Sequence, residues 1–295
     1  MRYIYQYTYK MSSKHTYSHH AAYKNPSEDR ATIIETNAGH KIYFVFDGHS
    51  GQECVEMVNK YLPKFVKQEL DDCETLSPEV ISSILTKSFE NMEQICEKVL
   101  RPWEGGTTAT ACVVTDTHIV TAHIGDSPCI LITRSGEYIS STSDHDTKNN
   151  SEKERVRAGG GWFSNQNEFG EERLFNCIAV TRCFGNIRNK ENQNGLIAVP
   201  EINIWERKPD TYLILCTDSF TEKLCDSLKG NGEKIIANRG THQEITKEIA
   251  NLLEYTDYNI ETAASLAVHQ RTMKFYNWAD GIYCGDNTSL ILVEL

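Results

Sequence analysis

The sequence predicts an α+β protein, and two observations lead to this class. Residues 107–142 contain three short apolar runs separated by turn-forming residues, which is typical of an antiparallel meander. After Gly51 and after Thr241, apolar residues instead recur at the three- and four-residue spacing of amphipathic helices. The helices come in two pairs, one between the early strands and one late in the chain, as expected for α+β organisation.

The first elements are strands. Residues 1–10 (MRYIYQYTYK) alternate aromatic and polar side chains, which favours a strand; they lack the apolar core and small-residue cleavage site of a signal peptide. The apolar run IYFVF at residues 42–46 predicts a strand that is buried on both faces. This strand is expected to stop at a loop formed by residues 47–49, DGH.

Two amphipathic helices are expected next. The first follows Gly51 and contains Pro63, which is expected to kink or split it because proline removes one backbone hydrogen bond. The second begins after Ser77, a helix N-cap residue, with Pro78 at the first helical position. Both apolar faces fit packing against a sheet.

The second half of the chain continues the alternation. Ser151 and Glu154 predict a capping box for a short basic helix that ends at residues 159–161, GGG. Residues 211–217 (TYLILCT) predict another buried strand, and Thr241 with Glu244 predicts the start of a further helix. A helix near residues 260–273 and a last strand, TSLILVEL at 288–295, complete the expected elements.

Composition limits the function classes. The 295 residues include 30 Lys and Arg against 41 Asp and Glu, a net charge of −11, which argues against nucleic acid as the main partner. Hydrophobic residues make up 39%, enough for an ordinary globular core. No stretch approaches the roughly 18 apolar residues of a membrane span, so no membrane partner is expected. We expect one domain over residues 1–295.

The ten cysteines are scattered, without a CxxC pair or zinc-type spacing. Most fall in apolar runs, which indicates reduced and buried thiols in a cytoplasmic or nuclear protein. Cys183 and Cys216 are expected to be inert. His19 and His20 could bind a metal, but a solvated turn is the preferred interpretation.

Acidic residues stand at the ends of the most apolar strands. Asp47, Asp218 and Asp286 each have this position, and the pair Glu28-Asp29 precedes the apolar run that begins at Ala31. An isolated aspartate beside glycine or asparagine is usually a turn residue. If the strands are neighbours, however, their acids converge and repel one another unless cations compensate. Ligation by oxygen alone favours Mg²⁺ or Mn²⁺ over zinc.

Seven ordered segments carry a family resemblance. They are FVFDGHSG (44–51), GGTTAT (105–110), HIGDS (123–127), EKERVRAGG (152–160), AVTRCFGN (179–186), LILCTDSF (213–220) and GDNTSLILV (285–293). In order and spacing the chain resembles metal-dependent Ser/Thr protein phosphatases of the 2C type, from about Tyr23 to Val293. The resemblance implies a four-layer αββα sandwich, with two central antiparallel β-sheets flanked by helices.

The resemblance also implies metal ligands. Asp47 would bridge two Mn²⁺ or Mg²⁺ ions and the Gly48 carbonyl would bind one of them, while Asp218 and Asp286 would bind the other. By position, Glu28 and Asp29 match the family's acidic pair that supports the metals directly or through water. Asp126 matches the acid that helps to hold a weaker third metal.

Two further residues match groups that act on the substrate. His49 resembles the family's general acid for the departing Ser or Thr oxygen, although a histidine that only hydrogen-bonds the loop is the alternative. Lys24 stands where the family usually has an Arg that binds the phosphate with two hydrogen bonds. Lysine keeps the positive charge but lacks the planar guanidinium that makes both bonds.

Three other positions depart from the family pattern. Ser219 replaces a Gly and is expected to crowd or reshape the turn at Asp218, and Glu222 replaces an Asp near the third metal. Asn186 replaces an Asp and so removes one negative charge.

Two function classes remain open at this point. The first is an enzyme that hydrolyses phosphoserine or phosphothreonine in a phosphorylated protein substrate, acting as a monomer. The second is a catalytically silent scaffold or regulatory protein of the same fold, which should lack one or more of Asp47, Asp218 and Asp286; this chain has all three. A hydrolase of a smaller phosphate ester is a further possibility, because specificity would lie in the loops around residues 163–195.

Overall fold

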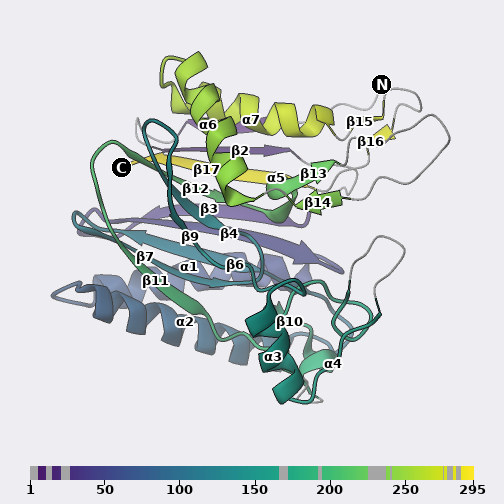
Figure 1. The fold of residues 1–295 in the computed structure, drawn as a ribbon. Coiled ribbons are helices and arrows are strands. Elements are labelled where there is room, and N and C mark those ends of the chain that lie inside the picture. Colours follow the sequence, from purple (N-terminus) through teal and green to yellow (C-terminus); the bar gives the residue numbers. More distant parts are fainter. Residues whose placement is uncertain are drawn as a thin grey trace. The chain divides into compact units, whose positions relative to one another are not determined.

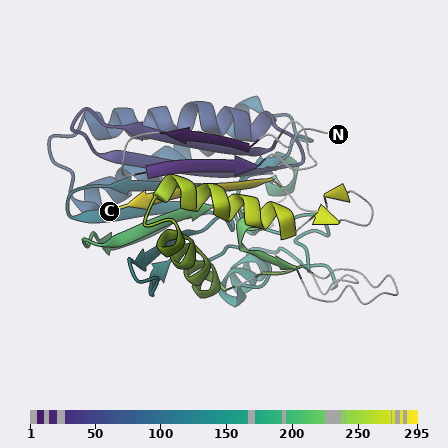
Figure 2. The same cartoon turned by 90° about the horizontal axis from the view of Figure 1, so that it is seen from above.

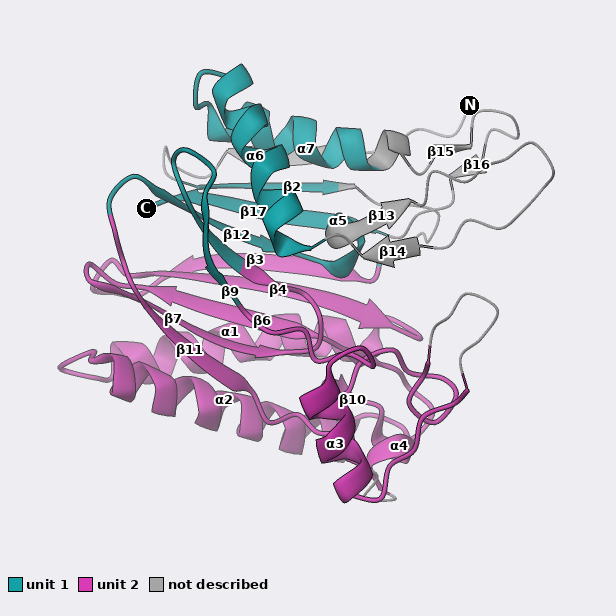
Figure 3. Ribbon diagram, in the orientation of Figure 1, with its two compact units in different colours: residues 1–27, 130–141, 209–295 teal, residues 28–129, 142–208 magenta. Residues whose placement is uncertain are grey.

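The computed structural model divides the chain into two compact units (Figure 3). Unit 1 comprises residues 1–27, 130–141 and 209–295, and unit 2 comprises residues 28–129 and 142–208. Each unit has a sheet with helices against it (Figure 1). The structure describes residues 6–10, 15–20, 27–165, 172–191, 195–224, 237–239, 241–274, 276–277, 282–283 and 287–295.

The sheet of unit 2 has the strand order β10-β5-β4-β6-β7-β11, with β3 paired to β4. All of these pairs are antiparallel. The strands are β3 (Asp29–Glu35), β4 (Lys41–His49), β5 (Gly106–Thr107), β6 (Ala109–Val114), β7 (His118–Ile124), β10 (Phe184–Gly185) and β11 (Glu201–Glu206).

The expected end of β4 at Asp47 is wrong. The strand continues to His49, because Gly48 and His49 pair with Thr107 and Gly106 of β5. The apolar run alone did not show this, since the pairing depends on a two-residue strand about sixty positions further along. The run itself, Ile42 to Phe46, is buried as predicted.

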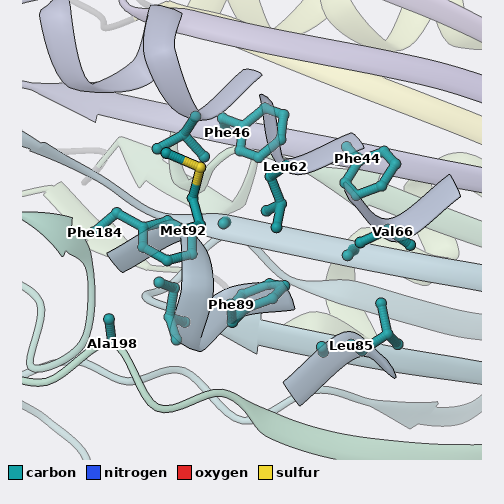
Figure 4. Close-up of a cluster of buried hydrophobic side chains, with 14 of the residues drawn as sticks. Phe44, Phe46, Leu62, Val66, Leu85, Phe89, Met92, Phe184 and Ala198 are labelled. Atoms are coloured by element: carbon teal, nitrogen blue, oxygen red, sulfur yellow. The ribbon is translucent and has the colours of Figure 1, made fainter. Parts of the chain in front are cut away.

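Two long helices, α1 (Glu53–Asp71) and α2 (Pro78–Val99), pack on the sheet of unit 2. Pro63 lies inside α1, which runs unbroken, so the expected split is wrong. The cap of α2 is confirmed, because the Ser77 side chain accepts a hydrogen bond from the Val80 N–H. Figure 4 shows the core between these helices and the sheet, with Phe44, Phe46, Leu62, Val66, Leu85, Phe89, Met92, Phe184 and Ala198 labelled.

Unit 2 also contains α3 (Asn150–Ala158) and the short α4 (Ile187–Lys190). The helix expected from the Ser151 capping box is present, but its N-cap is Asn149. The Asn149 side chain accepts from the backbone N–H groups of Ser151 and Glu152. The helix ends at Ala158 with Gly159 as its C-cap, in agreement with the predicted end at the glycine run.

The larger sheet of unit 1 has the order β1-β2-β17-β12-β8-β9. The three strands expected in one meander over residues 107–142 are therefore divided between two sheets. β6 pairs with β7 in the sheet of unit 2, whereas β8 pairs with β9 in the sheet of unit 1. His19 lies in β2 rather than in a solvated turn, and its buried ring is hydrogen-bonded to Ser289. The strands are β1 (Gln6–Lys10), β2 (His15–His20), β8 (Cys129–Thr133), β9 (Tyr138–Ser141), β12 (Thr211–Cys216) and β17 (Thr288–Glu294).

Helices α6 (His242–Tyr255) and α7 (Ile260–Lys274) pack against each other, and α7 lies along β2 and β17 (Figures 1 and 2). The predicted capping box of Thr241 and Glu244 is present. The remaining described elements of unit 1 are α5 (Asp218–Thr221) and two short antiparallel pairs, β13 (Glu222–Leu224) with β14 (Ala237–Arg239) and β15 (Tyr276–Asn277) with β16 (Ile282–Tyr283). Within the described ranges, no helix is both long enough and apolar enough to cross a bilayer.

Candidate functional site

Two carboxylates face each other across the β3·β4 pair. The register places Asp29 directly opposite Asp47. Side chains at such positions share one face of the sheet, with Cβ atoms about 5 Å apart. Asp29 is only 4% exposed, and Asp47 is half-buried. Like charges in this arrangement destabilise the fold unless a cation offsets their repulsion, so the pair suits a divalent ion.

Glu28 and Gly48 are held at the same end of the two strands. The Glu28 carbonyl accepts from the Gly48 N–H at 3.1 Å, and the Glu28 Oε1 accepts from the Gly51 N–H at 2.8 Å. A Cβ on residue 48 would lie 2.8 Å from the Glu28 carbonyl oxygen and 2.9 Å from Val55 Cγ1, so only glycine fits. Four of the predicted ligand positions therefore meet at one place in unit 2.

Asp126 is connected to this place through Thr108. The Thr108 Oγ1 accepts from the Asp47 N–H at 3.0 Å and is hydrogen-bonded to Ser127 Oγ at 2.8 Å. The preceding Gly125 has φ +94°, and a Cβ there would lie 2.5 Å from Thr108 Cγ2. Asp126 itself is 3% exposed. The turn that carries Asp126 is thus packed against Thr108, which is hydrogen-bonded to the Asp47 backbone.

His49 has a specific partner in Asn186. The His49 Nε2 lies 2.6 Å from the Asn186 Oδ1, which also accepts from the Cys183 thiol at 3.2 Å. Because an amide oxygen only accepts, this pair requires a proton on Nε2. A Cβ on Gly106 would lie 2.2 Å from the Asn186 Oδ1 and 2.8 Å from the His49 Nε2, so the glycine makes room for the contact. Asn186 takes the left-handed conformation, φ 49°, which asparagine tolerates.

A buried ion cluster supports the segment that leads to Asn186. Glu152, on α3, accepts hydrogen bonds from Arg155 and Arg182 at 2.6 Å each and from the Thr181 hydroxyl at 2.7 Å. Burial by itself would raise the pKa of Glu152, but these hydrogen bonds outweigh it and hold the pKa well below its usual range. The cluster anchors Thr181 and Arg182, four or five residues before Asn186. Sequence reasoning missed it, since nothing in the spacing connects residues 152 and 182.

Asp218 lies in unit 1, as the first residue of α5 and directly after β12 and Thr217. The turn is bonded to the start of β17: the Thr217 N–H donates to the Ser289 carbonyl at 3.1 Å, and the buried Ser219 hydroxyl donates to the Asn287 carbonyl. Ser219 therefore ties this turn to the start of β17, while the crowding or reshaping expected from it stays a prediction.

Three residues of interest cannot be placed in this way. Lys24 and Asp286 lie outside the described residues, and the side chain of Glu222 does as well. The roles expected for them stay predictions.

The thiols near these segments are unreactive in character. Burial raises the pKa of Cys183 to about 12, which suppresses the nucleophilic thiolate at neutral pH. Cys216 is fully buried in β12. Among the cysteines with described side chains, none lies in a disulfide, in agreement with the predicted reduced thiols.

A family model described as protein phosphatase 2C matches residues 8–230. The chain belongs to the protein phosphatase 2C family. It is 30% identical over 245 residues to "Probable protein phosphatase 2C 28" of Arabidopsis thaliana, covering 78% of this chain and 68% of that relative. It is 28% identical over 203 residues to "Protein phosphatase 1L" of Bos taurus, covering 65% of this chain and 55% of that relative.

Solved structures confirm the protein phosphatase 2C fold. A serine-threonine phosphatase 2C from Toxoplasma gondii has a TM-score of 0.71 at 15% identity, covering 99% of this chain and 98% of that one. A C. elegans sex determining protein has a TM-score of 0.70 at 20% identity, covering 97% of this chain and 65% of that one. The α+β class with two antiparallel sheets flanked by helices is therefore confirmed, while the single domain over residues 1–295 stays a prediction.

Proposed function

We propose that this member of the protein phosphatase 2C family is an active, metal-dependent phosphatase that removes phosphate from serine or threonine in a phosphorylated protein. The observation that supports this most directly is the pair of carboxylates, Asp29 and Asp47, opposed on neighbouring strands. A protein that used the fold only for binding would have no need of two opposed carboxylates, whereas a metal enzyme uses them as ligands.

We propose two Mn²⁺ or Mg²⁺ ions as the cofactor. Asp47 and the Gly48 carbonyl would hold them from unit 2, supported by Glu28 and Asp29. We propose Asp218 and Asp286 as further ligands and Asp126 as a ligand of a weaker third ion. All of these groups offer oxygen, which hard divalent ions prefer. When bound, such ions acidify water and offset phosphate charge.

His49 would supply the proton that the departing serine or threonine oxygen needs, because an alkoxide is a poor leaving group. Its ring is oriented by Asn186 through the 2.6 Å contact at Nε2. We therefore assign Asn186 as a positioning residue for His49, in place of a charged aspartate. Lys24 would contribute positive charge to the phosphate, without the bidentate geometry of arginine.

The setting of the activity is proposed as well. We propose a phosphoprotein substrate, a monomeric enzyme and a cytoplasmic or nuclear location, on the grounds of the acidic composition and the buried thiols.

The test is turnover of a small phosphomonoester by the purified protein. Activity should require added Mn²⁺ or Mg²⁺, disappear with a chelator, and fall to background in Asp47→Asn. The matched control is Asp116→Asn, an exposed aspartate in the turn after β6, which should keep full activity. Turnover without metal would refute the mechanism, and no turnover with any metal would favour the silent scaffold.

A further inference from the structure

Two histidines and a glutamate converge in unit 2, away from the acidic pair. Strand register places His123 of β7 directly opposite Glu201 of β11. His145, between β9 and α3, stacks on His123 with ring centroids 4.4 Å apart and planes 9° apart. One ligand atom from each of the three residues lies within 4.8 Å of the other two.

The two imidazoles are deeply buried and incompletely hydrogen-bonded. Each histidine is 1% exposed, and the Nδ1 of each has no hydrogen-bond partner among the described residues. The His123 Nε2 donates to the Ser143 carbonyl at 2.7 Å, so its Nδ1 carries a lone pair. The His145 Nε2 lies 3.3 Å from the Glu201 Oε2. Buried polar nitrogens without partners are rare in folded proteins and need a physical explanation.

The protonation states suit metal binding. Burial, reinforced by the neighbouring His145, lowers the pKa of His123 to about 4, so this ring is neutral at pH 7. The hydrogen bond from His145 lowers the pKa of Glu201 to about 2, so its carboxylate is ionised. Neutral imidazole and ionised carboxylate are the forms that coordinate a cation.

We propose that His123, His145 and Glu201 form a binding site for a transition metal ion, with Zn²⁺ as the best match. Two imidazoles and one carboxylate are a donor set that zinc accepts, whereas Mg²⁺ and Mn²⁺ favour sites made of oxygen alone. The carbonyl of Ser143 orients His123 from the side away from the metal, the usual arrangement around a ligating histidine. The Glu201 side chain is 35% exposed and gives the ion a route from solvent.

Binding requires only side-chain movement. Zinc–ligand distances of about 2.0–2.2 Å bring the ligand atoms closer together than they are here, so the rings must tilt out of their stack. The backbone of His145 stays fixed, because its N–H donates to the Gly125 carbonyl at 2.9 Å and its carbonyl accepts from the Thr181 N–H at 2.8 Å. Gly125 precedes Asp126, so an ion at this site would also stiffen the turn that carries Asp126.

The site can be tested with Co²⁺ as a spectroscopic probe in place of Zn²⁺. Metal-stripped protein is titrated with Co²⁺ in excess Mg²⁺, which saturates the oxygen sites, and Zn²⁺ is then added as a competitor. We expect one equivalent of Co²⁺ with the intense visible absorption of four-coordinate, nitrogen-ligated cobalt, bleached by stoichiometric Zn²⁺. The absence of this absorption would overturn the proposal.

Variants separate this site from the acidic one. His145→Gln should weaken binding by at least about tenfold, and Glu201→Gln serves as a second variant if the first does not fold. His118→Gln, on the same strand β7, is the matched control and should bind as the unaltered protein does. Asp47→Asn should also leave the cobalt spectrum unchanged, so a failed phosphatase assay would not affect this result. Binding that survives both His145→Gln and Glu201→Gln would refute the assignment.

Discussion

Replacing Glu152 with glutamine tests whether the buried ion cluster holds unit 2 together. The carboxylate is 4% exposed and accepts five hydrogen bonds, two from each of Arg155 and Arg182 and one from Thr181. Glutamine keeps the size of the side chain but loses its charge, and it places an NH₂ group among donors. The guanidinium groups of Arg155 and Arg182 would then have no negative charge at this position to offset their own.

The expected cost follows from this geometry. Removing one partner of a buried ion pair destabilises a protein by about 3–5 kcal/mol. Arg155 is 27% exposed and recovers part of its hydration, so the lower end, about 3 kcal/mol, is expected for Glu152→Gln. That is a large share of the roughly 5–15 kcal/mol by which a typical domain is stable.

The effect should also depend on pH. Folding lowers the pKa of Glu152 from its ordinary value of 4.5, so its stabilisation is complete above about pH 4.5 and is lost as the pH falls further. The free energy of unfolding is measured by urea denaturation at pH 7 and at several lower values. The gap between the unaltered protein and Glu152→Gln should narrow as the pH falls below 4.5. The exposed Glu154→Gln on the same helix is the control. A variant within about 0.5 kcal/mol of the unaltered protein at pH 7 would refute the reasoning.

Two further predictions concern single contacts. Asn186→Ala should lower kcat for phosphate esters with poor leaving groups by about 10-fold or more, with little change in KM, because His49 loses its orienting partner. The measurement is kcat for a series of esters that differ in the pKa of the leaving group. Equal slowing of esters with good leaving groups would contradict the prediction. Phe89→Ala should lower the free energy of unfolding by about 3–5 kcal/mol, because the ring is fully buried and lies 5.2 Å from that of Phe184. Urea denaturation measures this loss, and a change below about 1 kcal/mol would show that the core in Figure 4 is not tightly packed.

Local patterns predicted most helices and strands. For α2 and α6, the apolar spacing and the N-caps at Ser77 and Thr241 were sufficient to predict the helices, because both signals lie within a short stretch of sequence. The predictions were wrong where pairing with a distant segment of the chain determines the extent of a strand or the sheet to which it belongs. β4 extends past Asp47 because β5 pairs with it, and the meander divides because β8 joins β12 and β17 in another sheet.

Sequence motifs predicted individual residues of the candidate site, but not the contacts between them. Glu28, Asp29, Asp47 and Gly48 do meet at one end of β3·β4. The contact between His49 and Asn186 was not foreseen, because 137 positions separate them and no local pattern connects them. The same holds for His123, His145 and Glu201, which sheet register and ring stacking bring together.

β2 and β17 are neighbours in one sheet, although their paired residues stand as far apart as His20 and Thr288. A ribosome delivers β2 long before β17 exists. β2 can pair with β1 at once, but the backbone donors and acceptors on its other edge stay unpaired until β17 is made. The strands β3 to β7 pair with one another within residues 29–124 and can assemble during translation, before β10 and β11 add to β5 and β7. Nascent-chain stalling at successive lengths should therefore show protease-resistant unit 2 first, with unit 1 acquiring resistance only once residue 294 has left the exit tunnel.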